Sequence, residues 1–547
     1  MRDVWLGQGP TPSERYEAMY AEFRWQIPET FNFATDVVDR WAAGTDGPAL
    51  LWENAAGEQR AFNYSDLARL SCQLANVLRA RGVEKGDRVI IMLPRVPEWF
   101  VAITAALRIG AVPIPCIEML TPRDIEYRVR NAEVKAAICR PEHAAKFASV
   151  ENDVPVRIAL GQAAGWLDWQ QEVPRASEAI EAETVRNDDP AIMYYTSGST
   201  GHPKAVVHAA RAIYAWRVSA IYWLDLRPGE VIWCTADTGW SKAGTSIIFG
   251  PLSCGACSFF FDGPFDPRQR PQLLRKHRIT VYCAPGTELL HVVTEIQRDN
   301  LVALRRVVTA GEAMNPIVAE RWEAATGIRI DEAYGQTEAL MVALNYPNEP
   351  VRYGSMGRPS PGSDIDVIDS SGCRLPAGQE GDLAIKVPNP QLMLGYWKNA
   401  GRTAECYLDG PEGQWYLTSD RAERDADGYF WYRGRSDDVI NSAGYRIGPI
   451  EVENVLVEHP AVQVCAVTAS PDAERGEIVK AFVVLRDGVQ PSPELTRQLQ
   501  DHVKAVTAPY KYPRAIEYLA ELPMTITGKI RRRELRDREL ARTSTKK

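Results

Sequence analysis

A short loop rich in glycine and hydroxyl side chains ends on Lys204. Glycines let a backbone approach a polyphosphate closely, while N–H groups, hydroxyls and a lysine supply hydrogen-bond donors and positive charge. The spacing differs from the Walker form, which needs four residues between its first glycine and Gly-Lys. Taken alone, this composition also fits a flexible Ser/Gly turn. The residues that could contact phosphate are Thr196, Ser197, Gly198, Ser199, Thr200, Gly201 and Lys204.

Two later segments and a residue near the end of the chain carry groups that nucleotide chemistry uses. The ring of Tyr334 can cover a nucleobase, Thr337 can reach phosphate oxygens, and Glu338 offers the hard oxygen ligand that Mg²⁺ prefers. A carboxylate such as Asp420 can accept hydrogen bonds from both hydroxyls of a ribose. A positioned cation such as Lys529 stabilises charge that spreads over phosphate oxygens in a transition state. Without further information, these residues would be ordinary helix-start, turn and surface charges.

The elements that must position these residues alternate in the manner of an α/β domain. Leucines at helical spacing predict a helix from about Tyr64 that ends before Gly82, and a second helix is expected over 98–109. Apolar runs predict buried strands at 88–93, 111–116, 191–196, 231–235, 280–284 and 304–309. After position 351, short β-like segments with dense turns predict a small β-rich subdomain.

The last part of the chain predicts a separate α+β lobe, with helices at 449–458 and 494–506 and strands at 462–468 and 478–485. We expect an N-terminal ATP- and acid-binding domain over 1–435 and a C-terminal domain over 436–547. The predicted fold class is α/β. It has a large body of several subdomains, in which βαβ layers adjoin the β-rich subdomain, and a smaller mobile α+β lobe.

Motifs in a fixed order resemble the adenylate-forming superfamily of acyl-CoA synthetases, carrier-protein adenylation domains and luciferases. After the phosphate loop they are Gly311–Ala313, Tyr334–Glu338, Tyr416–Asp420, Gly434–Asp438, Asn441–Arg446 and Thr525–Lys529. The chain looks most like the medium-chain acyl-CoA synthetases, through Ala236–Trp240, Ser442–Glu453 and Thr507–Pro513. The resemblance extends from about Phe31 to the end of the chain.

The resemblance implies a site for ATP and Mg²⁺, with Tyr334 on adenine and Asp420 on ribose. Besides the phosphate loop, the residues implied to bind ATP or AMP are Gly311, Glu312, Ala313, Glu332, Ala333, Tyr334, Gly335, Gln336, Thr337, Asp420, Arg435 and Lys529. The residues implied to be catalytic are Thr196, Glu338 and Lys529, and those implied to hold the metal are Glu338 and Thr200.

The resemblance also implies a second half-reaction, in which the thiol of coenzyme A takes the acyl group from acyl-AMP. Gly444 lacks a side chain and would let the narrow pantetheine arm pass. Asp437 matches a hinge whose rotation would move the C-terminal lobe between the two half-reactions. The residues implied to bind coenzyme A are Ala443, Gly444, Tyr445, Arg446, Arg475 and Lys504.

Three residues bear on which carboxylic acid is accepted. By resemblance Trp240 lines the acyl pocket, although an aromatic of this kind could equally be part of a core. Acetyl-CoA synthetases carry a tryptophan at the position of Gly335 that caps the pocket, so we expect acids larger than acetate: medium-chain, branched or small aromatic. Lys242 could reach a ring substituent on the acid, but we expect a surface lysine.

The predicted function is therefore that of an AMP-forming acid–thiol ligase. Two alternatives are an enzyme that loads a carrier protein and a non-catalytic relative that binds nucleotide or acyl groups. The presence of Glu338, Asp420 and Lys529 together argues against the non-catalytic alternative. The residues that resemble a coenzyme A site argue against the carrier protein.

Composition limits the partners and the compartment. The chain of 547 residues has 63 Lys and Arg against 71 Asp and Glu, and this acidic balance disfavours nucleic acid. Its ten cysteines lack the spacing of a disulfide framework or metal site, Cys254 and Cys257 included. No apolar run reaches the roughly 20 residues of a spanning helix, and Met1–Trp25 lacks the apolar core of a secretory signal. We expect a cytoplasmic protein.

Overall fold

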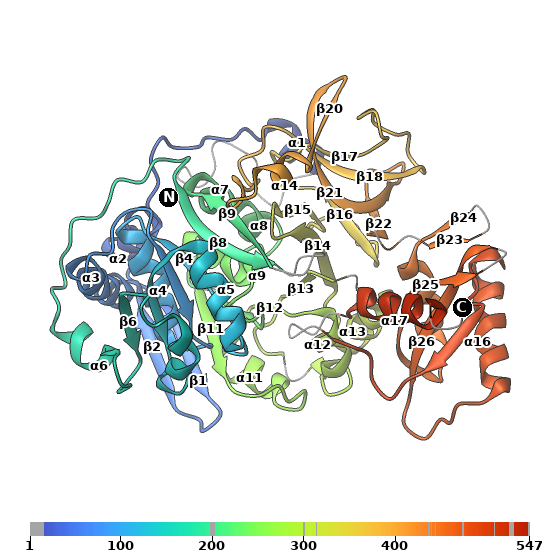
Figure 1. Cartoon of the computed structure of the whole chain (residues 1–547), viewed down its shortest axis with the longest axis horizontal. Helices are drawn as coiled ribbons and strands as arrows, with labels where there is room; N and C mark the ends of the chain where they lie inside the picture. The colour runs from blue at the N-terminus through green and yellow to red at the C-terminus, as the bar shows by residue number, and fades with distance from the viewer. Residues whose placement is uncertain are drawn as a thin grey trace. The chain divides into compact units, whose positions relative to one another are not determined.

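The chain folds into two compact units (Figure 1). The computed structural model describes residues 16–196, 203–298, 301–312, 314–435, 438, 440–442, 445–472, 475–507, 509–524 and 530–544. Unit 1 comprises Met1–Met314, Val318–Asp364 and Pro388–Cys406. Unit 2 comprises Asn315–Ile317, Ile365–Val387 and Tyr407–Lys547. The β-rich segments after 364 thus group with the C-terminal lobe, while the predicted domain boundary at position 435 stays a prediction.

The largest sheet of unit 1 has a parallel centre, in which β1, β11, β10, β12, β13 and β14 are neighbours in that order. Antiparallel strands flank it, β2 beside β1 on one side and β15 followed by β16 beside β14 on the other. The strands are β1 (Pro48–Asn54), β2 (Gln59–Asn63), β10 (Val231–Cys234), β11 (Cys257–Asp262), β12 (Val281–Cys283), β13 (Arg306–Ala310), β14 (Ile330–Gln336), β15 (Leu340–Leu344) and β16 (Ser355–Pro359).

Two smaller sheets complete the described strands of unit 1. One is parallel, in the order β4 (Val112–Pro115), β3 (Arg88–Met92), β5 (Val134–Cys139), β6 (Val156–Ala159) and β7 (Leu167–Asp168). The other is antiparallel, in the order β19 (Gly395–Tyr396), β9 (Lys204–Ala209) and β8 (Pro190–Thr196). The strands predicted at 88–93, 111–116, 191–196, 231–235, 280–284 and 304–309 are confirmed to within two residues at each end.

Helices surround these sheets (Figure 1). They are α1 (Tyr16–Glu22), α2 (Arg40–Ala43), α3 (Tyr64–Ala80), α4 (Pro97–Arg108), α5 (Pro122–Ala132), α6 (Trp169–Glu172), α7 (Ala210–Ala215), α8 (Arg217–Tyr222), α9 (Ser241–Ala243), α10 (Gly250–Ser253), α11 (Arg270–Lys276), α12 (Gly286–Val292), α13 (Pro316–Thr326) and α14 (Ala400–Ala404). The α3 helix shows why the predictions were correct. Its leucines at 67, 74 and 78 are buried, Asp66 caps its first turn through the N–H of Asn63, and Gly82 follows its end with a positive φ.

Unit 2 contains one antiparallel group of strands and one mixed sheet, which helices accompany. The first has the order β17 (Ile365–Ile368), β18 (Glu380–Lys386), β21 (Gly413–Arg424) and β22 (Phe430–Arg435), with β20 (Tyr407–Gly410) beside β21. The second has the order β24 (Tyr445–Ile447), β23 (Ile440–Ser442), β26 (Gly476–Leu485) and β25 (Val462–Asp472), with β27 (Ala515–Tyr518) parallel to β26. Its helices are α15 (Pro449–Glu458), α16 (Pro493–Val506) and α17 (Arg532–Ser544).

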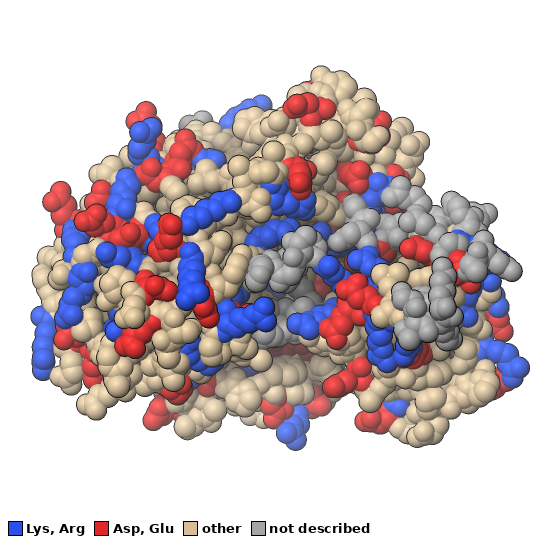
Figure 2. Space-filling model, in the orientation of Figure 1, with Lys and Arg blue, Asp and Glu red and all other residues tan. Residues whose placement is uncertain are grey.

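Charged side chains of both signs are interspersed over the face drawn in Figure 2, where the described Lys and Arg residues do not gather in a single basic patch. None of the helices in the described ranges has both the length and the apolarity needed to cross a membrane.

A buried group of charges lies at the amino-terminal part of β13 and β14 in the large sheet. The carboxylate of Asp331 in β14 lies 2.8 Å from Arg306 in β13 and 3.0 Å from Arg329. Arg306 also donates hydrogen bonds to the backbone carbonyls of Trp223 and Asn345. Burial raises the pKa of Asp331 and the two guanidinium groups oppose this. The pair therefore stabilises the unit only while both signs of charge are present.

Replacing Arg306 with methionine should lower the free energy of unfolding by about 3–5 kcal/mol. The buried Asp331 would keep only Arg329 as a partner, and two buried backbone carbonyls would lose their donor. Urea denaturation followed by tryptophan fluorescence measures this loss. The matched control is Arg497→Met, which removes an ion pair with Glu494 whose side chains are 69% and 64% exposed and should cost about 0–1 kcal/mol. Equal losses in the two variants would contradict the role of the buried charges.

Candidate active site

Two of the predicted nucleotide-binding segments start at the ends of neighbouring parallel strands. Ala310 in β13 pairs with Ala333 in β14, so Gly311 and Tyr334 follow at the same edge of the sheet. Gly311 has a φ of 96°, a left-handed conformation that favours glycine. Ligands of open α/β sheets bind outside the carboxyl ends of the strands. The structure thus brings Gly311 and Glu312 close to the segment at 332–338.

Gly335 is required by the packing of the backbone. A Cβ atom at this position would lie 1.9 Å from the carbonyl oxygen of Leu340, where the register between β14 and β15 shifts by one residue. A tryptophan here would require the hairpin of β14 and β15 to move. Glycine at this position is therefore explained by backbone packing as well as by the size of the acid that we expect. The sequence alone did not reveal this close approach.

Two residues of the segment 393–396 form hydrogen bonds to Glu338, one to its side chain and one to its backbone. The hydroxyl of Tyr396 donates a hydrogen bond to Oε1 of Glu338 at 2.8 Å, and the N–H of Met393 donates to its backbone oxygen at 2.8 Å. Lys204 pairs with Thr196 across β8 and β9, and its Nζ lies 5.1 Å from the centre of the Tyr396 ring. The structure therefore joins the predicted metal ligand to both ends of the predicted phosphate loop.

Sequence analysis missed Tyr396. The residue lies in Gly395-Tyr396-Trp397, a segment without the charged or hydroxyl-rich pattern that marked the other motifs. An aromatic residue between polar turns was the only signal that could have drawn attention to it.

Thr337 connects the nucleotide segment to the segment predicted to bind the acid. Its Oγ1 lies 3.1 Å from the hydroxyl oxygen of Ser241, the residue after Trp240. Its backbone oxygen accepts a hydrogen bond from Nε2 of His208 at 2.7 Å. Burial lowers the pKa of His208 to about 4, although this hydrogen bond opposes the shift, so the ring is neutral near pH 7. The two segments are adjacent in unit 1.

The environment of Trp240 and Lys242 corrects one expectation. Trp240 packs partly buried against the main core, and among the described residues its indole N–H has no hydrogen-bond partner. Lys242 is only 9% exposed, so the prediction of a surface lysine is wrong. The α9 helix directs its side chain inward, where Nζ donates to the oxygen of Ala310 at 3.0 Å. Burial alone would raise the pKa of the nearby Cys283 thiol. A hydrogen bond from Cys234 and the charge of Lys242 outweigh this effect and lower that pKa.

The residues predicted to bind ribose meet on two paired strands of unit 2. Asp420 in β21 is the register partner of Arg435 in β22, and Oδ1 of Asp420 lies 3.6 Å from the guanidinium group. The N–H of Asp420 donates to Oγ1 of Thr418 at 3.2 Å. Asp420 is 6% exposed, so the groups packed around it restrict the direction of its carboxylate. A buried, oriented carboxylate beside a cation suits a diol next to phosphate.

The chain on both sides of the predicted catalytic lysine is anchored in unit 2. Met524 and Ile530 form an antiparallel bridge, and the N–H of Arg531 donates to the oxygen of Pro523 at 2.8 Å. The guanidinium group of Arg532 donates two hydrogen bonds to Glu453, at 2.9 and 2.5 Å. These contacts fix the positions of the residues that flank 525–529 on both sides.

The residues predicted to bind coenzyme A are less closely grouped. Lys504 is exposed at the end of α16, where its Nζ donates to Asp501 at 2.8 Å and lies 4.5 Å from the ring centre of Tyr512. The N–H of Arg475 donates to Asp472 at 2.9 Å. Tyr445 and Arg446 belong to the backbone of β24. The structure does not join Arg475 and Lys504 by any hydrogen bond among the described residues.

Several predicted site residues lie outside the described residues. They are Ser197, Gly198, Ser199, Thr200, Gly201, Ala313, Asp437, Ala443, Gly444 and Lys529, together with the side chains of Tyr445 and Arg446.

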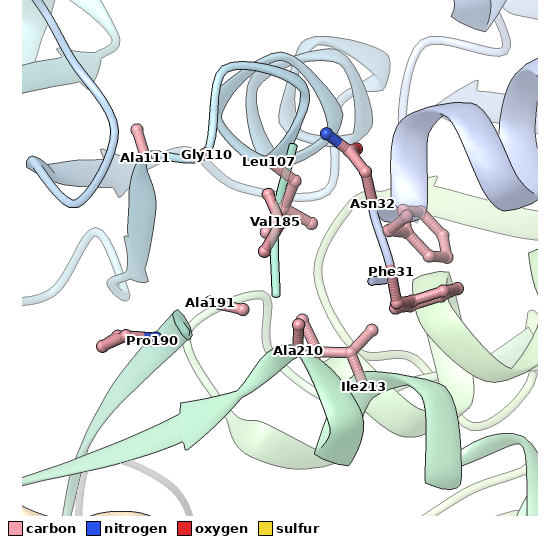
Figure 3. Close-up of a pocket in the computed structure, with 11 residues that line it drawn as sticks. Phe31, Asn32, Leu107, Gly110, Ala111, Val185, Pro190, Ala191, Ala210 and Ile213 are labelled. Atoms are coloured by element: carbon pink, nitrogen blue, oxygen red, sulfur yellow. The ribbon is translucent and has the colours of Figure 1, made fainter. Parts of the chain in front are cut away.

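A small pocket elsewhere in unit 1 takes no part in this arrangement (Figure 3). It is lined mainly by apolar side chains such as Phe31, Leu107 and Ile213, and by none of the predicted site residues. Its polar side chain, Asn32, donates both amide hydrogens to backbone carbonyls, at 3.1 and 3.0 Å. The pocket is therefore a packing feature of the core.

Comparison with known proteins decides the family. A family model described as AMP-binding enzyme matches residues 38–397, and a model of the AMP-binding enzyme C-terminal domain matches residues 451–529. The chain belongs to the AMP-binding enzyme family. It is 41% identical to acyl-coenzyme A synthetase ACSM3, mitochondrial, of Homo sapiens, over 97% of this chain and 93% of that protein.

Solved structures of the same family share its fold. The anthranilate CoA ligase AuaEII in complex with anthranoyl-AMP has a TM-score of 0.85 at 28% identity, over 94% of this chain and 99% of that one. A benzoate CoA ligase from Burkholderia xenovorans LB400 has a TM-score of 0.83 at 29% identity, over 92% and 100%. The predicted family, fold class and enzyme class are confirmed: this is an AMP-forming acyl-CoA synthetase type of ligase. The roles of individual residues stay predictions.

Glu332, which the family resemblance assigns to the ATP site, is a buried carboxyl group within β14, beside Thr309 of β13. The N–H of Met314 donates to its Oε1 at 3.4 Å. Burial raises the pKa of Glu332 to about 8, and the negative charge of Glu312 adds to the increase. The side chain is therefore protonated in the folded enzyme at neutral pH and ionised in the unfolded chain.

Stability should consequently fall as pH rises from about 4.5 to 8, since the unfolded chain releases this proton first. We expect the free energy of unfolding of the wild type, relative to Glu332→Gln, to decrease by roughly 4 kcal/mol over this interval. Urea denaturation at several pH values measures the difference. Glu320→Gln, on the exposed side of α13, serves as the control and should give a curve parallel to the wild type. A parallel curve for Glu332→Gln would show that this carboxyl group is ionised in the folded state.

Proposed function

We propose that this enzyme activates a carboxylic acid larger than acetate: medium-chain, branched or small aromatic. The carboxylate attacks the α-phosphorus of ATP to give acyl-AMP and release pyrophosphate. The thiol of coenzyme A then attacks the acyl carbonyl, which gives the thioester and releases AMP. The observation that carries the proposal is the contact between Ser241 and Thr337, because it puts the segment around Trp240 next to the nucleotide segment.

The charges of unit 1 suit the first half-reaction. Lys204 and the donors of the phosphate loop would bind the phosphates that become pyrophosphate, while Tyr334 would cover adenine. Glu338, with Thr200, would hold Mg²⁺, which neutralises phosphate charge when bound. A carboxylate has about four lone-pair sites, so the hydrogen bond from Tyr396 leaves capacity for a metal. The donor set therefore fits a cation held mainly through the nucleotide.

The residues of unit 2 would complete the two half-reactions. Asp420 and Arg435 would bind ribose and the adjacent phosphate, and Lys529 would stabilise the charge that develops during attack on the α-phosphate. The segment at 443–446, with Arg475 and Lys504, would bind coenzyme A, and Asp437 would be the hinge of the C-terminal domain.

The choice of acid follows from the neighbours of Trp240. Its ring would form an apolar wall of the acyl pocket, to which Gly335 would contribute no side chain. The names of two solved relatives state that they act on anthranilate and benzoate, which supports a ring-sized acid. Each methylene group buried adds about 0.8 kcal/mol, so affinity should rise with the size of the acid until the pocket is full.

We propose a cytoplasmic location because the cysteines form no disulfide bonds among the described residues. All ten cysteines lie among the described residues and are unpaired, which suits a reducing compartment such as the cytoplasm. The human relative is named as mitochondrial. Fractionation of the source cells would distinguish the two locations.

A panel of acids tests the proposed function. Aliphatic acids from two to ten carbons, branched acids and benzoate would be assayed for acid-dependent ATP–pyrophosphate exchange and for thioester formation with coenzyme A. We expect kcat/KM to rise about fourfold per added methylene over at least part of the series, from the free energy of burial. Acetate as the preferred acid would contradict the open pocket. Exchange without a coenzyme A thioester would indicate a carrier-protein partner, and no exchange with any acid would indicate a binding protein.

Replacing Lys529 with alanine should lower ATP–pyrophosphate exchange by several orders of magnitude, because the cation acts on charge that develops during adenylation. Thioester formation from preformed acyl-AMP should be nearly unchanged. The control is Arg531→Ala, which removes a half-exposed cation nearby that pairs with Glu534. Equal loss of both half-reactions in Lys529→Ala would exclude a role confined to adenylation.

A further inference from the structure

Tyr396 connects the carboxylate of Glu338 to the strand that begins with Lys204. Its hydroxyl donates to Oε1 of Glu338 at 2.8 Å. Its backbone lies in β19, where Tyr396 is the register partner of Val206 in β9. The N–H of Trp397 extends this pairing by donating to the oxygen of Ala205 at 2.8 Å. The donor thus has a fixed position relative to the strand that follows the phosphate loop.

Both ends of this hydrogen bond are immobilised. Tyr396 is 7% exposed, and its N–H donates to Oγ1 of Thr403 at 2.9 Å. On the other side, the backbone oxygen of Glu338 accepts from the N–H of Met393 at 2.8 Å. Met393 and Tyr396 belong to one short segment, so that segment holds Glu338 by its backbone and its side chain at once. Met393 thus fixes the backbone of Glu338, and the hydroxyl of Tyr396 fixes the direction of its side chain.

The electrostatic surroundings strengthen the same contact. A hydrogen bond to an ionised carboxylate is roughly twice as strong as one between neutral groups. The ammonium group of Lys204, 5.1 Å from the ring centre, lies within the distance of about 6 Å at which a cation is attracted to an aromatic ring. One side chain therefore orients an anion with its hydroxyl and a cation with its ring.

We propose that Tyr396 is a positioning residue for adenylation, which orients Glu338 toward the divalent cation of the nucleotide. It occupies one carboxylate oxygen and leaves the other oxygen for the cation. This inference rests on the proposed function, in which Glu338 binds the metal. Partners of metal ligands commonly contribute a factor of about 10–100 to metal affinity.

Tyr396→Phe tests the proposal because it removes the hydroxyl and keeps the ring beside Lys204. We expect the affinity of Mn²⁺ for the ATP-bound protein, measured by electron paramagnetic resonance, to fall about 10–100-fold. ATP–pyrophosphate exchange should need a correspondingly higher Mg²⁺ concentration. Thioester formation from preformed acyl-AMP, which requires no metal on pyrophosphate, should change less than about twofold. In a Glu338→Gln background the second substitution should have little further effect, since its target is absent.

The matched control is Tyr353→Phe, which removes a hydrogen bond of 2.6 Å from a tyrosine hydroxyl to Glu323 elsewhere in unit 1. It should leave Mn²⁺ affinity and both half-reactions unchanged. An unchanged Mn²⁺ affinity in Tyr396→Phe, or an equal loss of both half-reactions with a lower melting temperature, would overturn the proposal. The Mn²⁺ measurement needs no acid. It therefore decides this inference even if the wild type shows no exchange, a result that would contradict only the proposed function.

Discussion

The parallel register of β10, β12, β13 and β14 is the constraint on which the described half of the site depends. Parallel strands that pair in register end at one edge, so the loops after them must meet there whatever their separation in the chain. For this reason Gly311, which follows β13, lies near Tyr334 in the last part of β14, and the segment around Trp240 follows β10. Thr337 closes the group through Ser241.

Close approach of backbones at this edge explains why small residues occur there. Gly335 lies where the backbones of β14 and β15 nearly touch, and Gly239 lies against the backbone of Ile117, where a Cβ would come within 2.5 Å of its nitrogen. Such contacts bring the loops together more closely than side chains would allow. They also mean that the size of the acid cannot be adjusted by simply enlarging the residue at 335.

Several ionisable groups are buried in or against β13 and β14. Asp331 lies between two guanidinium groups, Lys242 donates to the end of β13, and Glu332 is held in its neutral form by burial. Buried charges cost free energy unless they are paired or neutralised, and here Asp331 is paired and Glu332 is neutral. The paired or neutral state of these groups supports the loops, whereas Glu338 is the carboxylate that a tyrosine orients. An acyl-CoA synthetase must bring an anionic acid to an anionic nucleotide, so a rigid arrangement of charge is useful to it.

Local pattern determined much about this protein. The periodicity of residues 64–80, the apolar strands and the lobe after 449 were predictable because their signals lie within a few adjacent residues, and the ordered motifs revealed the family. The burial of Lys242, the need for glycine at 335 and the part played by Tyr396 were not predictable. Each depends on an atom contributed by a distant segment: the oxygens of Ala310 and Leu340 and the carboxylate of Glu338. Only the tertiary structure decides such contacts, because the packing of strands and loops, and not their order in the chain, determines which groups come within hydrogen-bond distance.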